Sequence, residues 1–385
     1  MPSAPAPHEA LAAAVAAVPG VRTPALVLDL DALEHNVRAT VARLGAGRWM
    51  PHVKTAKQRV AVAALLAAGV RAFKAATLEE VDLVRREAGP AGVTVEVLLA
   101  HPAWGATARG ALARLGDPHA RLALLADGPE HLAHLRELAA ALGTPRVPIY
   151  LDVDVGMHRT GRPAEVWLDL RRTAGDGPFE VAGVSAYEGH LGWDDRAAAF
   201  AAYEAAARVA RAYGAPCVVT SGSHTFHHAQ ACPALSAGPF EARVSPGTVV
   251  FSDRRTHRAA AHLGLRQAVY VATRVVSAPR PGRVTCDAGS KAIAPDCPAP
   301  GLAVLGHPAL RPLERSEEHL PLAVERAPAP APGDLLLLVP DHACTTVNLH
   351  RMALWVRTDR VVGHGPVEAR GHGLFDALSR EVPAP

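Results

Sequence analysis

The stretch Arg48-Trp49-Met50-Pro51-His52-Val53-Lys54 opens a long series of short β-rich runs that alternate with Ala- and Leu-rich helical segments. Successive runs start roughly 23 to 35 residues apart, a spacing typical of repeated β-α units. Eight such units predict a closed (β/α)8 barrel of the TIM type, with functional residues at the carboxyl ends of its strands. We expect these strands at 48–53, 71–75, 94–99, 121–125, 146–153, 181–187, 216–220 and 247–251.

The sequence on either side of this series predicts a second, mostly β domain. A strand is expected at 25–29, before a helix opened by Asp31 with Glu34 three residues later, as in a capping box. We therefore expect the barrel over residues 30–251 and the β domain over 1–29 and 252–385. After residue 251, short strands separated by Pro/Gly turns are expected at 270–277, 282–287, 335–339, 344–349 and 352–357.

Composition argues against several classes of protein. The chain of 385 residues carries a net charge of only +3 and lacks basic-aromatic stretches, so nucleic acid is not an expected partner. The sequence contains no run of about 18 apolar residues, so no membrane span is expected. Residues 1–20 lack a basic start and are interpreted as a loose arm and an Ala-rich helix, not a signal peptide. Five widely spaced cysteines favour reduced thiols in a cytoplasm.

Lysine is scarce in this chain. Of 40 basic residues only Lys54, Lys57, Lys74 and Lys291 are lysines, which leaves 36 arginines. Arginine stays charged, whereas a partly desolvated lysine can lose its proton and form a Schiff base. Lys54 closes the first predicted strand next to His52, so it is the leading candidate for a reactive amine, although a solvated charge is the plainer interpretation. Lys57 is expected on a helix surface.

Polar residues follow most of the predicted strands. The turn Ser221-Gly222-Ser223 follows the seventh strand, where barrels often bind phosphate through backbone N–H groups. A phosphate site facing the Lys54 amine suggests pyridoxal phosphate, whose ring is an electron sink. Taken singly these residues have ordinary interpretations, because Tyr187 could simply pack and Arg159 could cap a loop. The other candidates at strand ends are Thr77, His101, Asp127, His158 and His190.

His342 and Cys344 form a second candidate site. We expect them on or beside a strand, where residues two apart project to the same face. Imidazole and thiolate together favour Zn²⁺, and two protein ligands leave open positions that suit a catalytic metal. An isolated His-x-Cys pair is more often a buried cysteine beside a structural histidine, because 20 histidines make chance proximity common.

Several distinct short motifs follow one another along the chain. They include Thr-Pro-Ala-Leu-Val-Leu-Asp (23–29), Pro-His-Val-Lys-Thr (51–55), Asp-Val-Gly-Met-His-Arg-Thr-Gly (154–161) and Pro-Asp-His-Ala-Cys-Thr-Thr-Val-Asn-Leu (340–349). In these motifs, from about residue 23 to 371, the chain resembles the D-threonine aldolase / D-serine dehydratase family. Members of this family are pyridoxal-phosphate enzymes with an alanine-racemase-like fold of type III.

The resemblance implies a metal-dependent lyase that acts on a small D-amino acid with a β-hydroxyl group, working as a cytoplasmic homodimer. It also implies that strand 25–29 joins the C-terminal β domain. Lys54 would carry pyridoxal phosphate, and the metal would be Zn²⁺, with Mn²⁺ as a second possibility. The remaining implied residues are Ser221, Gly222 and Ser223 at the phosphate, Thr77, Arg159 and Tyr187 lining the cofactor, and His342 and Cys344 at the metal.

Two departures bear on the reaction that the resemblance implies. Ala56 stands where the family often has histidine. Aldolases of the family commonly show His-x-Asp at the metal and dehydratases His-x-Cys, so Cys344 favours elimination of water over cleavage to glycine and an aldehyde. A pyridoxal-phosphate-dependent racemase and a non-catalytic pyridoxal-phosphate carrier are the alternatives.

Overall fold

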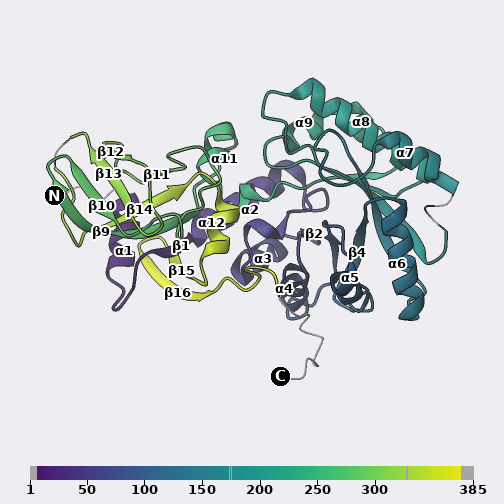
Figure 1. The fold of residues 1–385 in the computed structure, drawn as a ribbon, viewed down its shortest axis with the longest axis horizontal. Helices are drawn as coiled ribbons and strands as arrows, with labels where there is room; N and C mark the ends of the chain where they lie inside the picture. The colour runs from purple at the N-terminus through teal and green to yellow at the C-terminus, as the bar shows by residue number, and fades with distance from the viewer. Residues whose placement is uncertain (1–6, 173, 175, 327, 374–385) are drawn as a thin grey trace. The chain divides into compact units, whose positions relative to one another are not determined.

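The computed structural model describes residues 7–172, 174, 176–326 and 328–373, which divide into two compact units (Figure 1). The barrel unit comprises the described parts of Val41–Lys54, Val62–Gly247 and Gly371–Pro385. The β unit comprises the described parts of Met1–Thr40, Thr55–Ala61 and Thr248–Arg370. The chain therefore passes from one unit to the other directly after Lys54.

A seven-stranded parallel sheet forms the barrel unit, and residues 49–52 close it. Trp49 pairs in parallel with Val244 at one edge of the sheet, and His52 pairs in parallel with Lys74 at the other. The predicted (β/α)8 barrel is therefore confirmed. Its strands, in sheet order, are β2 (Ala72–Ala75), β3 (Val95–Leu99), β4 (Ala120–Ala126), β5 (Val147–Val153), β6 (Phe179–Ala186), β7 (Cys217–Thr220) and β8 (Glu241–Val244).

Helices surround the strands of this barrel (Figure 1). In α8 (Arg196–Tyr213), alanines at helical spacing form the buried face, and their small side chains let the helix approach the strands closely. None of the described helices is long and apolar enough to cross a membrane. The other helices are α3 (Arg59–Ala67), α4 (Leu78–Ala88), α5 (Gly105–Leu112), α6 (Pro129–Ala141), α7 (Ala164–Asp169), η2 (Leu170–Arg172), α9 (Phe226–Ala231) and α10 (Pro233–Ser236).

The eighth strand is not where the sequence placed it. A strand was expected at 247–251, but β8 is Glu241–Val244 and Thr248–Val250 form the 3-10 helix η3. The charged residue Arg243 lies on β8 and pairs with Glu96 at 2.5 Å and with Glu241 at 2.6 Å. A search for apolar runs misses this strand because it contains two charged residues. The partner Glu96 that neutralises Arg243 comes close only in the folded protein.

The β unit contains a mostly antiparallel sheet in the order β12-β13-β10-β9-β1-β15-β16, with β14 pairing β9 and β11. β1 pairs antiparallel with β9 and parallel with β15, which confirms that the early strand joins the C-terminal strands. Its strands are β1 (Ala25–Asp29), β9 (Val269–Arg280), β10 (Arg283–Cys286), β11 (Leu302–Val304), β12 (Leu310–Pro312), β13 (Leu320–Val324), β14 (Leu335–Pro340), β15 (Met352–Arg357) and β16 (Arg360–Pro366).

Helix α1 confirms the expected Ala-rich N-terminal helix and covers part of this sheet. Its Leu11 and Val15 pack in one buried cluster with Val27, Tyr270 and Val356 of the strands. The cluster excludes water from one face of the sheet, which makes burial of apolar area its main stabilisation. The helices that accompany the β unit are α1 (Pro7–Ala16), α2 (Leu30–Leu44), η3 (Thr248–Val250), α11 (Arg254–Ala259), η4 (Ala261–Leu263) and α12 (Ala343–Leu349). The 3-10 helix η1 (Val53–Thr55) lies where the chain leaves the barrel unit.

Two local expectations are wrong. The helix after β1 is capped by Asp29, whose Oδ1 accepts the N–H of Ala32 at 2.9 Å, while Asp31 accepts hydrogen bonds from Arg357 and Thr358. Lys57 is not on a helix surface. It is buried with a φ of 54°, and its Nζ donates to the carbonyl oxygen of Ala369 at 2.9 Å.

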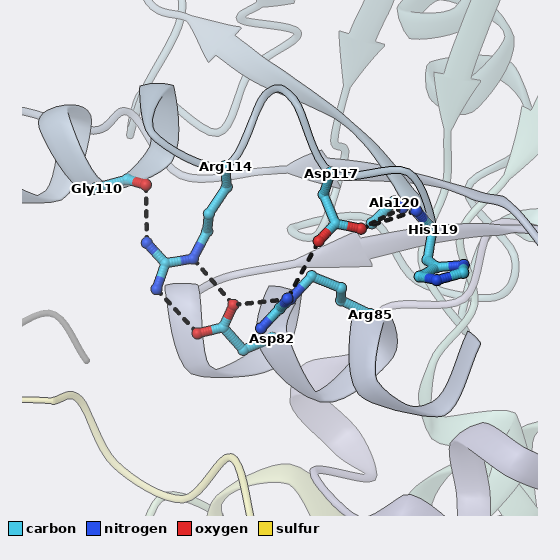
Figure 2. Close-up of polar contacts among 7 residues, drawn as sticks. All are labelled: Asp82, Arg85, Gly110, Arg114, Asp117, His119 and Ala120. Carbon is cyan, nitrogen blue, oxygen red and sulfur yellow. Dashed lines mark hydrogen bonds and ion pairs between the residues drawn. The ribbon is translucent and has the colours of Figure 1, made fainter. Parts of the chain in front are cut away.

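A buried ion-pair network fastens α4 and α5 to the turn before β4 (Figure 2). Arg114 donates to both carboxylate oxygens of Asp82 at 2.9 Å, and both side chains are buried. Arg85 bridges Asp82 and Asp117 at 3.6 and 3.1 Å. Asp117 also accepts two backbone N–H groups at the start of β4. The network thus sets the position of β4 relative to both helices.

Replacing Arg114 by methionine should destabilise the barrel unit strongly. The change leaves the buried Asp82 carboxylate without its bidentate partner, a loss of about 3–5 kcal/mol in typical buried pairs. We expect a clearly lower urea midpoint for Arg114→Met. The matched change Arg85→Met, at a more exposed pair, should cost about 1 kcal/mol or less. Equal midpoints for Arg114→Met and the parent protein would contradict this role.

Candidate active site and metal centre

Lys54 lies where the closing segment of the barrel ends. After His52 the chain turns into the 3-10 helix η1 (Val53–Thr55), and the backbone N–H of Lys54 donates to Nδ1 of His52 at 3.3 Å. The turn ends the strand at the carboxyl edge of the barrel. The structure therefore places Lys54 at the end of the barrel where functional residues of this architecture gather.

Two cations lie near the ring of Tyr187. The Nζ of Lys54 is 5.9 Å from the ring centroid, and the Cζ of Arg159 is 5.4 Å from it. Both distances are within the range of attraction between a cation and an aromatic face. Three residues from different strand ends are therefore brought close together.

Two glycines leave room for the Tyr187 ring. A Cβ on Gly189 would lie 2.4 Å from the ring, and a Cβ on Gly222 would lie 3.1 Å from it. Any other residue at Gly189 would displace the ring, because heavy atoms do not approach this closely. Gly222 belongs to the predicted phosphate turn, so this turn lies against the edge of the ring.

Ser221 is held toward the protein interior. It is buried with a φ of 72°, and its Oγ donates to the hydroxyl of Tyr203 at 3.1 Å. Its N–H donates to Oε2 of Glu188 at 3.3 Å. Glu188 is fully buried and also accepts from the hydroxyls of Tyr203 and Thr225. The predicted turn is therefore anchored through Ser221, and the N–H of Gly222 donates to Oγ1 of Thr225 at 3.2 Å.

Sequence reasoning missed Glu188, although this acid directly follows Tyr187. The role of Glu188 as a hydrogen-bond acceptor for this turn could not be predicted, because no sequence pattern connects Glu188 to Thr225 or to the turn after β7.

Thr77 caps helix α4. Its Oγ1 accepts the N–H of Glu80 at 3.2 Å, and the Glu80 carboxylate accepts the N–H of Ala76 at 2.7 Å. This reciprocal pattern is a capping box. Thr77 thus has a structural role that the structure displays directly, at the start of the helix that follows β2.

His342 and Cys344 lie at the start of a helix, so the strand expected at 344–349 is wrong. β14 ends at Pro340, His342 occupies the N-cap position, and α12 (Ala343–Leu349) follows. The β-branched residues of this segment suggested a strand, but the buried carboxylate of Asp253 accepts the N–H of Ala343 at 2.9 Å and satisfies the first turn of the helix.

Side chains that are distant in the sequence contact the His-x-Cys pair and the residue before it. Arg254 donates to the Asp341 carboxylate at 2.6 Å. The hydroxyl of Thr55 lies 3.2 Å from the Sγ of Cys344, and Thr55 is the residue that follows Lys54 in the chain. Both contacts lie within the β unit. The pair is therefore held by residues far apart in sequence.

His342 has a carboxylate partner. Its Nδ1 lies 2.6 Å from Oδ2 of Asp296, and the hydroxyl of Thr345 donates to Oδ1 of Asp296 at 3.1 Å. Burial opposes a charge on the imidazole, but the hydrogen bond with Cys344 and the Asp296 carboxylate outweigh it and raise the pKa of His342 to about 9. A carboxylate on one ring nitrogen orients the other toward a metal in many sites.

Asp296 and Cys297 were not predicted as site residues. Ligand atoms of Asp296, Cys297 and His342 all lie within 4.8 Å of one another. Cys297 is buried, which raises its thiol pKa, and its Sγ lies 3.9 Å from the guanidinium of Arg255. An Asp-Cys pair in a loop gives no spacing signal of its own, so only the fold reveals its proximity to His342.

The donors around His342 fit a divalent metal of the zinc type. Imidazole, thiolate and carboxylate are the groups that bind Zn²⁺ in proteins. The group near Lys54 fits pyridoxal phosphate: it has an amine, an aromatic face and a glycine-containing turn at the carboxyl ends of parallel strands.

A family model described as "Alanine racemase, N-terminal domain" matches residues 28–254, more than half of the chain. The chain belongs to this family. A second model, described as "Putative serine dehydratase domain", matches residues 268–356 and includes the His-x-Cys pair. The alanine-racemase-like fold expected from the sequence is thereby confirmed.

Relatives within this alanine-racemase-type family are similar over nearly their whole length. A D-threonine aldolase from Arthrobacter sp is 29% identical over 377 residues, which cover 91% of this chain and 93% of the relative. The solved structure of a D-threonine aldolase from Filomicrobium marinum has a TM-score of 0.80 and 26% identity, covering 91% of this chain and 95% of its own.

A D-threo-3-hydroxyaspartate dehydratase from Delftia sp. HT23 has a TM-score of 0.72 and 25% identity, covering 92% of this chain and 98% of its own. Alanine variants of a dehydratase of this name have been solved in which a histidine, or a cysteine two positions later, is replaced. The cysteine variant is described as being in the metal-free form.

Proposed function

We propose that this protein is a lyase that uses pyridoxal phosphate and a divalent metal on D-amino acids with a β-hydroxyl group. The observation that carries the proposal is the Lys54 amine beside Tyr187 and Arg159 at the carboxyl ends of a family barrel. The similar proteins are named as aldolases and dehydratases, which are lyases for this substrate class.

Lys54 would hold the cofactor through its amine. Tyr187 would support the cofactor ring, Arg159 would supply positive charge beside it, and Gly222 with Ser223 would approach the phosphate. When bound, pyridoxal phosphate supplies an electron sink that stabilises negative charge at the substrate Cα. Thr77 would act through the first turn of α4, whose N–H groups its capping box arranges.

We infer that His342 and Cys344 bind the metal and that Asp296 orients His342. The support is the 2.6 Å contact between Asp296 and Nδ1 of His342, which leaves the other nitrogen to an ion shared with Cys344. The thiolate favours Zn²⁺ over Mn²⁺. A bound Zn²⁺ would supply a Lewis acid for a β-hydroxyl oxygen.

In elimination, the Lys54 amine, released when the substrate amine takes its place, would take the proton from Cα, and the β-hydroxyl would gain a proton and leave as water. Hydrolysis of the released enamine gives a keto acid and ammonia. In aldol cleavage, the β-hydroxyl loses its proton, the Cα–Cβ bond breaks, and Lys54 would return a proton to Cα to give glycine. Cys344 favours elimination, because a dehydratase among the similar proteins has a histidine and a cysteine at the same spacing, and its cysteine variant is described as being in the metal-free form.

A homodimer and a cytoplasmic location complete the proposal. The homodimer is supported by the family resemblance of the sequence, and the cytoplasmic location by the five widely spaced cysteines.

Lys54→Ala should abolish both the visible absorbance of lysine-bound cofactor and turnover, because no other amine would take its place. Purified protein with pyridoxal phosphate and Zn²⁺ should convert D-3-hydroxyaspartate, D-serine or D-threonine to a keto acid and ammonia. Keto acid, ammonia, glycine and aldehyde are each measured after incubation with every substrate.

The control is Lys291→Ala, because this exposed lysine pairs with the surface residues Glu317 and Glu318. A visible band that survives Lys54→Ala would exclude Lys54 as the cofactor lysine. Glycine and aldehyde would assign the aldolase reaction instead. Isomerisation without release would indicate a racemase, and binding without turnover would indicate a carrier.

Cys344→Ala should remove a metal ligand, and Asp296→Asn should weaken Zn²⁺ binding about 10- to 100-fold, the usual loss for a partner that orients a ligand. Competition with a chromophoric chelator measures the affinity. In the Co²⁺-substituted protein, the sulfur-to-metal charge-transfer band should disappear in Cys344→Ala and persist in Cys297→Ser.

Cys297→Ser is the decisive comparison, because Cys297 also lies near His342. Loss of the charge-transfer band in Cys297→Ser alone would move the ion to the group Asp296, Cys297 and His342. Glu317→Gln, on an exposed carboxylate paired with Lys291, should leave the affinity unchanged.

A further inference from the structure

A second lysine, Lys74, is buried inside the barrel. It lies on β2, and only 5% of its surface is exposed. Ala72, two residues earlier, belongs to the interior cluster with Leu98, Tyr150 and Val219. Because alternate residues of a strand share a face, Lys74 also points into the barrel, one layer closer to the carboxyl ends.

Asp152 lies in the same layer. It follows Tyr150 of the interior cluster by two residues, and 6% of its surface is exposed. Thr160 hydrogen-bonds its carboxyl group, yet Oδ2 receives no hydrogen bond from the described residues. Lys74 attracts this carboxylate, but no ion pair within 4.0 Å joins the two side chains in the described part of the chain.

The segment that ends in Lys54 runs alongside Lys74. His52 pairs with Lys74, and the Lys74 N–H donates to the carbonyl oxygen of Pro51 at 2.9 Å. The charged groups that act on Lys74 are Asp152 and Glu188, which are negative, and Lys54 and Arg159, which are positive. Two lysines therefore share one small, largely buried electrostatic environment.

Burial, with a smaller contribution from Lys54 and Arg159, lowers the pKa of Lys74 to about 8 against the opposing effect of Asp152 and Glu188. Burial likewise raises the pKa of Asp152 to about 6, although Thr160, Lys74 and Arg159 oppose it and Asp127 adds to it. The Lys74 ammonium therefore releases its proton at lower pH than an ordinary lysine does.

We propose that Lys74 is a positioning residue for Lys54, the proposed cofactor lysine. The ammonium group of Lys74 repels a second positive charge at Lys54. The proposal rests on the function proposed for Lys54. Nearby cations are one way in which proteins keep a reactive lysine amine neutral. Methionine at this position would have no charge, and arginine could not release its charge, so lysine alone gives repulsion that fades as the pH rises.

The test is a pH titration of the visible band of protein loaded with pyridoxal phosphate. The positive charge of Lys74 disfavours the protonated form of the Lys54-bound cofactor, so its removal should raise the midpoint. We expect Lys74→Met to raise it by about one pH unit, or about tenfold in proton affinity. Lys74→Arg keeps the charge and should leave the midpoint at or below that of the parent.

Lys291→Met is the matched control, since it removes an exposed lysine of the β unit. An unchanged midpoint in Lys74→Met would overturn the proposal. So would equal upward shifts in Lys74→Met and Lys74→Arg, because a lost side-chain shape and not a lost charge would then be the cause. Loss of the band in Lys54→Ala checks the underlying function separately.

A reciprocal measurement keeps the proposal testable if the Lys74 variants fail to fold. Only four lysines occur in the chain, so carbon-13 labelling at lysine Cε gives few NMR signals to follow with pH. In cofactor-free protein, the Lys74 signal should titrate at higher pH in Lys54→Ala than in the parent, because a like charge has gone. An unchanged Lys74 titration would refute the coupling.

Discussion

Residues 49–52 close the barrel because they form hydrogen bonds with both edge strands of the sheet, β8 and β2. The N–H of Met50 donates to the carbonyl oxygen of Val244 at 2.9 Å, and the N–H of Lys74 donates to that of Pro51 at 2.9 Å. Proline fits here because its carbonyl accepts while its missing N–H is not required. A slip of one residue would turn Met50 out of the interior, so the register is fixed. The same register places Lys54 at the carboxyl edge.

The barrel interior changes character along its axis. Met50, Ala72 and Tyr150 form an apolar layer, and the next layer toward the carboxyl ends carries Lys74 and Asp152. Burying ions costs several kcal/mol each unless partners compensate. A layer of incompletely paired charges is therefore a poor way to stabilise a barrel. Its place next to the strand ends is consistent with a function in setting charge at the site.

The sequence predicted elements whose pattern is local. The strands at 25–29 and 352–357 match β1 and β15, because each contains a short continuous apolar run bounded by proline or polar residues. Strand β8 and helix α12 were misassigned, because each depends on a distant partner: Glu96 neutralises Arg243, and Asp253 caps α12. Asp296 and Glu188 escaped notice for the same reason. Single side chains that meet only after folding leave no periodic trace in a sequence.

Lysine scarcity signals more than one physical requirement. Lys57 is buried, and its compact ammonium donates to the carbonyl oxygen of Ala369, a point-charge contact that the planar guanidinium of arginine would not reproduce. Lys74 is buried among mixed charges, and Lys54 lies over an aromatic ring at a strand end. Lys291 is exposed between two glutamates and meets no requirement that arginine could not satisfy. Three of the four lysines therefore have a specific contact or charge environment, and the barrel register distinguishes the proposed cofactor lysine, Lys54, from Lys74.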